Sequence, residues 1–344
     1  MKSRYLGRDK AIHQQKRKIG VLLTNLGTPD EPTSGALRKY LRQFLSDPRV
    51  VEIPRFIWMI ILHGIILRVR PQKSAKLYES IWTDKGSPLM VISQDMRDKI
   101  AQQLNASEQD ELVIDIAMRY GEPAIPKALN RMQEQGVDKL IVLPLYPQYA
   151  GPTTASAFDE VTNELAKWRW IPSLHFINGY HDHPLYIQAL ANSIKEHFEA
   201  HGEPDKLILS YHGMPKHFLD SGDPYFCFCH KTTRLVTEKL GLAEDKFMTT
   251  FQSRFGKAEW LKPYTDETLE GLPAQGVKNV AIISPAFSAD CLETLEELVH
   301  ENKDIFIEAG GEAYSYIPAL NDRDDHCNAL AAIIAAQIEA CKQQ

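Results

Sequence analysis

The sequence predicts an α/β protein made of two similar halves, each containing a parallel sheet. Short apolar runs alternate with longer helical stretches along most of the chain, which is typical of a doubly wound sheet. The chain also repeats a strand-to-turn pattern, because residues 22–29 and 208–215 each place an apolar run before a glycine and a proline. Two further echoes pair residues 119–121 with 254–256 and residues 135–137 with 275–277. We therefore expect the carboxyl-end loops of both halves to face one cleft.

Length and composition favour a globular protein of one large or two medium domains. The 344 residues are 44% hydrophobic and 24% charged, and both shares are ordinary for such proteins. A formal net charge of −6 gives no reason to expect a nucleic-acid partner. The five cysteines are an odd number without the spacing of a disulfide framework, which indicates a reducing compartment. Neither a GxGxxG motif nor a P-loop motif is present, so the sequence does not support nucleotide binding.

The N-terminal residues 1–17 are basic and polar, and we expect them to form a poorly ordered tail. They lack the apolar core of a secretory signal. Apolar runs closed by glycine or proline predict strands at 18–23, 112–118, 139–145, 174–177, 207–210 and 280–283. Helical patterns predict helices near 34–44, 93–104, 181–202, 290–300 and 322–340, with a polar connection at 77–89.

The apolar stretch at 56–69 is interrupted by a His-Gly pair and bounded by prolines. At about 1.5 Å per residue it would span about 21 Å, which is less than the roughly 30 Å core of a bilayer. We therefore do not expect a transmembrane helix. Either a buried core helix or an exposed apolar lip at 54–70 fits the pattern. The flanking residues Arg55, Arg68 and Arg70 would suit contact of such a lip with anionic lipid.

Two stretches carry residues that could do chemistry. The strand at 207–210 ends at a Gly-Met-Pro turn, so His212 is expected at a strand's carboxyl end, where open α/β sheets bind ligands. A helix beginning near Asp290 would carry four polar side chains on one face and three apolar side chains on the opposite, core-facing stripe. The polar set is Asp290, Glu293, Glu297 and His300, and the apolar set is Leu292, Leu295 and Val299.

These residue types suit proton transfer and metal handling. An imidazole takes up protons near neutral pH, and a row of carboxylates attracts a hard divalent cation. A histidine at a strand end is more often structural, however, and an acidic helix face is more often merely solvated. Spacing alone therefore leaves both interpretations open.

A series of short motifs resembles the ferrochelatase family, the lyases that insert Fe²⁺ into protoporphyrin. The resemblance covers roughly residues 18–325, with the motifs in family order. The motifs are NLGTP at 25–29, YLRQFLSDPRV at 40–50, GSPL at 86–89, MRYGEP at 118–123, LYPQYAGPTTAS at 145–156, SYHGMP at 210–215, GDPY at 222–225, FQSRFG at 251–256 and SADCLETLEEL at 288–298.

The resemblance implies two Rossmann-like, chelatase-like lobes with parallel sheets around a porphyrin cleft. The implied segments are the tail at 1–17, a first lobe at 18–178 plus 322–344 that carries the lip at 54–70, and a second lobe at 179–321. His212 matches the family's active-site histidine and Glu293 its facing glutamate, so both are implied to be catalytic and to touch the metal. Asp290 and Glu297 match acidic residues that line the metal path. The C-terminal helix is implied to return to the first lobe.

The resemblance also implies which residues hold the porphyrin. The matching positions are Leu26, Ser87, Arg119, Tyr120 and Tyr149. Relatives that use coproporphyrin carry tyrosine at the position of Leu26, so leucine favours protoporphyrin IX. Cys291 stands where some family members have histidine. This difference puts in doubt the assumption that no thiol takes part in the metal path.

The Cys227-Phe228-Cys229-His230 run looks like half of a metal site. A closed zinc or iron–sulfur site needs four ligands. Relatives that carry a [2Fe-2S] cluster have a cysteine where this chain has Gly151, and a C-terminal cysteine cluster, whereas Cys327 and Cys341 stand apart. We therefore expect no cluster and no cofactor beyond the substrate Fe²⁺.

The activity implied is ferrochelatase, which makes protohaem from protoporphyrin IX and Fe²⁺ in haem biosynthesis. We expect a cytoplasmic monomer with peripheral contact to the inner face of the membrane through 54–70. Two alternatives stay open. The protein could be a non-catalytic porphyrin or haem carrier, or a chelatase for another tetrapyrrole or metal such as cobalt or nickel.

Overall fold

The computed structural model describes residues 4–7, 17–107, 112–256 and 258–343. The chain divides into two compact units. Unit 1 comprises residues 1–145, 151–179 and 327–344, and unit 2 comprises residues 146–150 and 180–326. Each unit contains one four-stranded sheet in which all neighbouring strands run parallel. The prediction of two α/β halves with parallel sheets is therefore confirmed.

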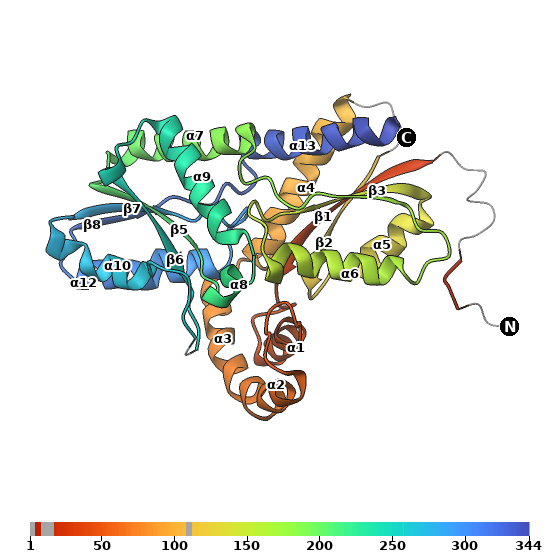
Figure 1. The fold of residues 1–344 in the computed structure, drawn as a ribbon, viewed down its shortest axis with the longest axis horizontal. Coiled ribbons are helices and arrows are strands. Elements are labelled where there is room, and N and C mark those ends of the chain that lie inside the picture. The colour runs from red at the N-terminus through yellow and green to blue at the C-terminus, as the bar shows by residue number, and fades with distance from the viewer. Residues whose placement is uncertain (1–3, 8–16, 108–111, 257, 344) are drawn as a thin grey trace. The chain divides into compact units, whose positions relative to one another are not determined.

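Unit 1 has the strand order β2-β1-β3-β4. Its strands are β1 (Lys18–Gly27), β2 (Leu112–Tyr120), β3 (Val137–Pro144) and β4 (Ser173–Phe176). Helices α5 (Ile125–Glu134) and α6 (Ser156–Leu165) cover one face, and α4 (Pro88–Ser107) and α13 (Asp324–Lys342) lie against the other (Figure 1). Buried aliphatic side chains of β1, β3, α5 and α6 form one core cluster, which fixes these helices on the sheet.

Unit 2 repeats the same architecture with the order β6-β5-β7-β8. Its strands are β5 (Lys206–His212), β6 (Phe247–Gln252), β7 (Asn279–Ile283) and β8 (Ala313–Tyr316). One side of the sheet faces α7 (Pro184–His201) and α9 (Tyr225–Leu240), and the other faces α10 (Thr265–Gly271) and α12 (Asn302–Glu308), as Figure 1 shows. Unit 2 also contains the short helices α8 (Lys216–Asp220), η4 (Glu244–Lys246) and η5 (Pro273–Gln275). Strands β6 and β8 were not predicted from the sequence.

The echo between the halves is visible in the strand registers. Asn25 pairs with Met118 in unit 1, and Tyr211 pairs with Phe251 in unit 2. Leu26 therefore occupies the position in unit 1 that His212 occupies in unit 2. The same alignment makes Arg119 equivalent to Gln252, so the expected match of 119–121 with 254–256 is wrong by two residues. Unit 2 has a longer loop there, because the bridge that closes it joins Phe251 to Tyr264, whereas Met118 joins Ala124.

The segment after residue 54 in unit 1 is helical but mostly not buried. It comprises α2 (Arg55–Ile61), a π-helical turn η2 (Leu62–Ile66) and α3 (Leu67–Ile81). The step of five between the buried residues Leu62 and Leu67 spans the π turn, and the buried side chains of the segment are Trp58, Leu62, Leu67, Pro71 and Tyr78. Helix α1 (Ser34–Leu45) packs on α3, and the Trp58 Nε1–H donates to the Leu45 carbonyl oxygen at 2.6 Å. Helix α3 also includes residues 77–81, which were expected to be a polar connection.

The acidic helix of unit 2 begins later than predicted. Helix α11 covers only Leu292–Leu295, and a π-helical turn η6 (Glu297–Glu301) follows before α12. The buried residues of this stretch are Thr294 and Leu298, whereas Leu292, Leu295 and Val299 are only partly buried. The predicted core-facing stripe is therefore wrong, because an ideal helical spacing does not survive the late start and the π turn.

Two features concern the ends of the chain and the membrane. The expected tail at 1–17 lies largely outside the described residues, but Leu6 exchanges backbone hydrogen bonds with Lys167 and Arg169. None of the helices in the described part of the chain is long and apolar enough to cross a membrane.

Candidate functional site

His212 is the last residue of β5, and its ring is oriented by its own backbone. The imidazole Nδ1 lies 2.7 Å from the Gly213 carbonyl oxygen. Because a carbonyl oxygen only accepts, Nδ1 carries the proton of the neutral ring, and Nε2 keeps a lone pair. A side chain at Gly213 would lie 2.6 Å from the Gln252 carbonyl oxygen, so only glycine permits this close turn. The His212 side chain is partly exposed, so Nε2 can accept a proton from outside the fold.

Glu297 is a carboxylate held by the residues that follow β6 and lies within reach of the charge of His212. Its Oε1 accepts from the Ser253 backbone N–H at 2.7 Å, and its Oε2 accepts from the Ser253 hydroxyl and from Gln252 Nε2 at 3.2 Å. Burial raises the pKa of the Glu297 carboxyl, and the Ser253 hydrogen bond and the charge of His212 oppose this effect. The charge of His212 therefore acts on the Glu297 carboxyl near the carboxyl ends of β5 and β6.

Gln252 and Ser253 hold this carboxylate, and the sequence reasoning assigned neither of them to the site. Gln252 accepts from the Ser210 hydroxyl at 2.9 Å and donates to the Glu293 carbonyl oxygen at 2.9 Å, which joins β5 to α11. Ser253 has a φ of 63°. This left-handed conformation costs an L-residue about 1–2 kcal/mol. One feature of the sequence could have identified these two residues, because both belong to the 251–256 motif. Paired parallel strands end at the same edge of a sheet, so this motif lies opposite His212.

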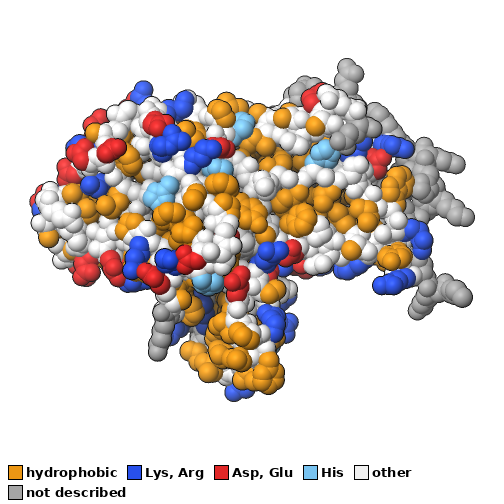
Figure 2. Space-filling view, in the orientation of Figure 1, with side chains coloured by type: hydrophobic (Ala, Val, Ile, Leu, Met, Phe, Trp, Pro, Cys, Tyr) orange, Lys and Arg blue, Asp and Glu red, His pale blue; other side chains and the backbone are white. Residues whose placement is uncertain are grey.

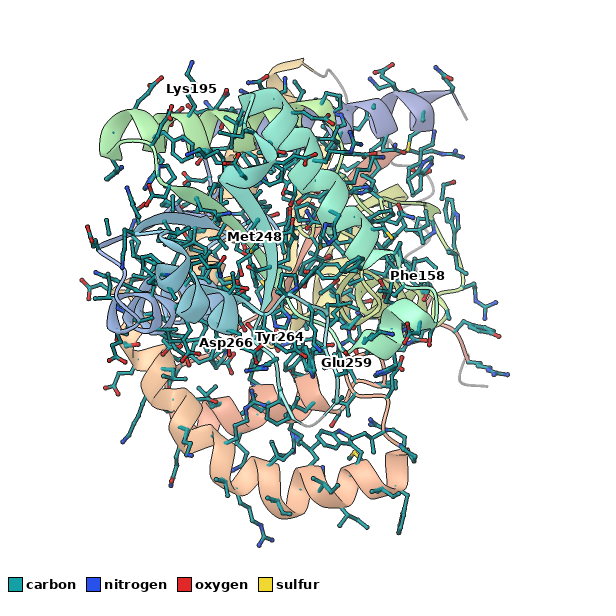
Figure 3. All side chains as sticks on the ribbon, turned by 60° about the vertical axis from the view of Figure 1, so that its left-hand side comes forward. Phe158, Lys195, Met248, Glu259, Tyr264 and Asp266 are labelled. Carbon is teal, nitrogen blue, oxygen red and sulfur yellow. The ribbon has the colours of Figure 1, made fainter. Side chains whose placement is uncertain are left out.

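The loop after Ser253 is fixed by a charged aromatic cluster. The Arg254 guanidinium forms ion pairs with Asp266 at 3.1 Å and Glu267 at 2.7 Å. It also lies over the Tyr264 ring, with 4.4 Å between Cζ and the ring centroid. Figure 3 shows Tyr264 and Asp266 beside each other at this edge. The cluster restrains the backbone that presents Ser253 to Glu297.

Asp290 is almost fully buried and lies before α11 rather than on it. Its Oδ1 accepts from the hydroxyls of Thr294 at 2.9 Å and Tyr316 at 2.6 Å. Its Oδ2 accepts from Asn321 Nδ2 at 2.7 Å, and its backbone N–H donates to Asn321 Oδ1 at 2.8 Å. The carboxylate is thus saturated by donors that tie three segments of unit 2 together.

Glu293 and Cys291 lie side by side at the start of α11. Cys291 is buried, and burial raises the pKa of its thiol, an effect that the charge of Glu293 strengthens. The Glu293 side chain is partly exposed, whereas His300 is exposed and lies within the π turn. The acids are therefore not the single helical row that the spacing predicts.

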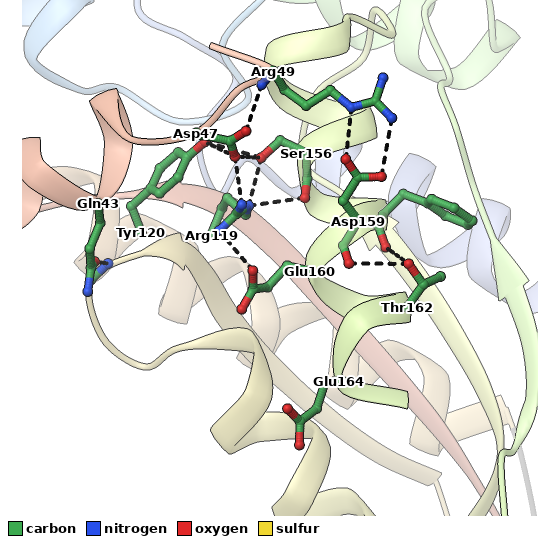
Figure 4. A network of polar contacts seen from close by, with 12 residues as sticks. Gln43, Asp47, Arg49, Arg119, Tyr120, Ser156, Asp159, Glu160, Thr162 and Glu164 are labelled. Carbon is green, nitrogen blue, oxygen red and sulfur yellow. Dashed lines mark hydrogen bonds and ion pairs between the residues drawn. The ribbon is translucent and has the colours of Figure 1, made fainter. Parts of the chain in front are cut away.

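In unit 1, Arg119 and Tyr120 belong to a buried polar network (Figure 4). The Arg119 guanidinium donates to Asp47 Oδ2 at 2.6 Å and to the Ser156 hydroxyl at 2.6 Å, and it pairs with Glu160 at 3.2 Å. The Tyr120 hydroxyl donates to the same Asp47 oxygen at 2.8 Å. Although burial opposes ionisation of Asp47, hydrogen bonds from Ser156 and Arg49 and the charge of Arg119 lower its pKa.

The other expected porphyrin-binding residues fall in both units. Leu26 is partly exposed near the end of β1, and Ser87 is buried and accepts from the Thr28 hydroxyl at 2.8 Å. Gly27 pairs with Tyr120, so Leu26, Ser87 and Tyr120 gather at one edge of the unit 1 sheet. Tyr149 is partly exposed and belongs to unit 2.

The Cys227–His230 run places its two thiols on different sides of one helix. All four residues lie on α9, where Cys227 is exposed and Cys229 is completely buried, so the two thiols do not face the same way. Within the described ranges, no three His, Cys, Asp or Glu side chains are grouped so that they could hold a metal ion. His212 and the neighbouring acids are thus not arranged as a closed metal cage.

Sequence and structure comparisons cover nearly the whole chain. The family described as Ferrochelatase matches residues 18–338. "Ferrochelatase 2" of Shewanella oneidensis is 61% identical over 94% of this chain and 98% of its own length. "Ferrochelatase" of Marinobacter nauticus is 53% identical, with coverage of 97% and 90%. SirB from Bacillus subtilis with Fe³⁺ has a TM-score of 0.55 over 95% of this chain and 98% of SirB, and its 12% identity shows a shared fold alone.

Proposed function

The chain belongs to the ferrochelatase family, and we propose that it is a lyase that inserts Fe²⁺ into protoporphyrin IX to give protohaem. His212 at the end of β5 is paired in register with Gln252, which donates to Glu297 at 3.2 Å, and this arrangement is the observation that carries the proposal. Metallation exchanges two pyrrole N–H protons for one Fe²⁺ ion and transfers no electrons. The reaction therefore needs a proton acceptor and groups that balance the metal charge.

His212 supplies the proton acceptor. Its Nδ1–H is held by the Gly213 carbonyl oxygen, so the Nε2 lone pair points away from that contact and is available to a pyrrole proton. Glu293 and Glu297 deliver Fe²⁺ and neutralise its charge. Glu297 suits this role because its carboxylate is pre-oriented by Ser253 and yet partly desolvated, a condition that strengthens attraction to a cation.

Asp290 takes a different role from the one its family position implies. Both of its oxygens already accept hydrogen bonds from neutral donors in the fold. We assign it to positioning, because it anchors the turn from which Glu293 projects. Its release to a metal ion would leave several buried donors without acceptors.

The residues expected to hold the porphyrin also fall into two groups, those that can touch it directly and those that shape its surroundings. Leu26 and Tyr149 are partly exposed and suit apolar contact with a macrocycle. Ser87, Arg119 and Tyr120 form hydrogen bonds with other side chains of the protein. They therefore contribute to porphyrin binding by shaping the edge of the unit 1 sheet. We retain protoporphyrin IX as the substrate because of Leu26.

We infer that the reaction uses no resident cluster, with Fe²⁺ as substrate only. The opposed directions of Cys227 and Cys229 support this inference. We also propose that the protein acts as a monomer in the cytoplasm, which sedimentation of the purified protein and fractionation of cells would test.

The decisive experiment for function is a metallation assay. Purified protein is mixed with protoporphyrin IX and Fe²⁺ under anaerobic conditions, and the porphyrin absorption spectrum is followed. Catalytic conversion to the haem spectrum over many turnovers supports the proposal. A carrier would give one binding change per protein and no turnover. A chelatase for another substrate would turn over faster with Co²⁺, Ni²⁺ or a different tetrapyrrole than with this pair.

We propose in addition that the apolar segment at 54–70 touches the inner face of the membrane. Its exposed side chains include Phe56, Ile60 and Ile65, which are 80%, 59% and 62% exposed. Figure 2 shows apolar side chains gathered over the part of unit 1 formed by α1 and α2. Such a surface suits the interface of a bilayer, and a membrane-facing entrance would suit a poorly water-soluble porphyrin. Phe56→Asp/Ile60→Asp should abolish flotation with liposomes, and equal flotation of variant and parent would contradict this contact.

A further inference from the structure

A basic cavity lies beside the apolar segment of unit 1. Helix α1 contributes Gly35, Arg38, Lys39 and Arg42, and the η2–α3 segment contributes His63, Leu67 and Arg68. The cavity measures about 440 Å³, within the range of about 300–1,000 Å³ that is common for ligand pockets. Apart from Gly35 and Leu67, its lining is entirely cationic or titratable to a cation.

The positive charge of this cavity is poorly compensated by the protein. Lys39 pairs with Asp30 at 2.7 Å, and Arg38 donates through Nε to the Leu67 carbonyl oxygen at 3.0 Å. Within the described part of the chain, Arg42 and Arg68 form no ion pair with an acidic side chain. The first turn of α1, which contributes Gly35, contains no acidic residue either. An anion would relieve the mutual repulsion of these groups.

The charged groups select the kind of anion. Guanidinium groups bind phosphate oxygens through paired hydrogen bonds, and two or three of them around one cavity favour phosphate over a single carboxylate. His63 adds a further donor when it is protonated. Phosphate is therefore the chemistry that this arrangement recognises best.

The surroundings of the cavity indicate where the phosphate comes from. Ile65 lies two residues after His63, and Val69 follows Arg68 directly, and these side chains are 62% and 57% exposed. A soluble phosphate compound would not need this apolar border, whereas a phospholipid presents its phosphate directly above acyl chains. We propose that the cavity between α1 and the η2–α3 segment binds the phosphate of an anionic phospholipid headgroup. This inference rests on the proposed membrane contact and adds lipid selectivity to it.

The test compares two matched double variants of the full-length protein. Arg42→Gln/Arg68→Gln removes two charges from the cavity, and Lys195→Gln/Arg234→Gln removes two charges from exposed helices of unit 2. Binding to phosphatidylcholine vesicles is measured with and without added phosphatidylglycerol. Phosphatidylglycerol should increase the vesicle affinity of the parent, and at about 1 kcal/mol per basic residue this increase should be about 30-fold smaller in the cavity variant. The unit 2 variant should lose much less, and both variants should keep the parental melting temperature and turnover with detergent-dispersed porphyrin.

Three outcomes would overturn the inference. Equal loss in the two double variants would mean that net charge, not the cavity, senses the lipid. Stabilisation of the parent but not the cavity variant by inorganic phosphate, without any difference on vesicles, would assign the cavity to a soluble phosphate compound. A raised KM for porphyrin in the cavity variant would assign it to porphyrin carboxylates. If Phe56→Asp/Ile60→Asp fails to reduce flotation, the membrane contact itself fails, and that result is distinct from all three.

Discussion

The carboxyl ends of β1 and β5 occupy equivalent places in two sheets of the same strand order, but they hold charge in opposite ways. At the end of β1, the Asp47 carboxylate is saturated by Arg119, Tyr120 and Ser156, and its pKa is lowered. At the end of β5, Glu297 is held by Ser253 and Gln252 without an arginine, and burial raises its pKa. The same scaffold thus stabilises an ionised carboxylate in one unit and disfavours it in the other.

The contributions of the two carboxylates to stability should therefore change in opposite directions as the pH rises. Asp47 has a folded-state pKa below the unfolded value of 3.8, so its contribution to stability is present above that value and is lost as the pH falls through the folded pKa. Glu297 has a folded-state pKa above the unfolded value of 4.5, so its contribution is present below that value and is lost as the pH rises through the folded pKa. A charge that opposes folding near neutral pH is typical of a functional residue.

The largest effect is expected from His212→Ala. Removal of the proton acceptor should lower turnover by about 1,000-fold, because a positioned general base contributes about 10²–10⁴. The melting temperature should stay close to that of the parent, since the ring is partly exposed and forms its hydrogen bond with the neighbouring residue Gly213. His201→Ala removes an exposed histidine from the same unit and should leave turnover unchanged. Parental turnover in His212→Ala would contradict the assignment of His212 as the proton acceptor.

The next largest effect is expected from Asp47→Asn. Loss of the charge leaves Arg119 short of a buried partner, which should lower the free energy of unfolding by about 3 kcal/mol. The deficit should shrink as the pH falls below the unfolded value of 3.8 and through the lower folded-state pKa, because the carboxyl of the parent is protonated first in the unfolded and then in the folded protein. Asp220→Asn, which breaks an exposed pair with Lys216, should change the unfolding free energy by less than about 0.5 kcal/mol. Urea titrations over a pH series measure both effects, and equal losses would mean that the unit 1 network is not structural.

A smaller effect is expected from Ser253→Ala. Loss of the hydroxyl removes a donor to Glu297 and should raise the pKa of Glu297 further. If ionised Glu297 delivers Fe²⁺, the acidic limb of the rate profile should move to higher pH. Ser80→Ala removes an exposed hydroxyl in unit 1 and should leave the profile in place. An unmoved acidic limb in Ser253→Ala would separate Glu297 from the rate-limiting chemistry.

The strand ends could be predicted from the sequence more accurately than the acidic helix. Gly and Pro at 213–215 stop β5 by simple backbone restrictions, so His212 was placed correctly at the end of that strand. The row from Asp290 to His300 assumed one ideal helix. The chain instead bends through a π turn at 297–301, so Glu297 faces Ser253 while Asp290 turns inward to Asn321.

The contacts of Arg119 could not have been predicted by motif or spacing. Its main partners, Asp47 and Ser156, are 72 and 37 residues away in sequence, and only the tertiary fold brings them together. The same limit applies to the lip, because the sequence left burial and exposure open. A helical pattern cannot distinguish a core helix from an exposed one when nearly every position is apolar.

The most direct test of the comparison measures Asp47→Asn and Glu297→Gln side by side. Urea unfolding gives the stability of each variant near neutral pH, and the metallation assay at a temperature below both melting points gives turnover. We expect Asp47→Asn to lose about 3 kcal/mol of stability and keep most of its turnover. We expect Glu297→Gln to be at least as stable as the parent and to lose turnover about ten-fold or more. The reverse pattern, or the same pattern in both variants, would contradict the assignment of one carboxylate to structure and the other to function.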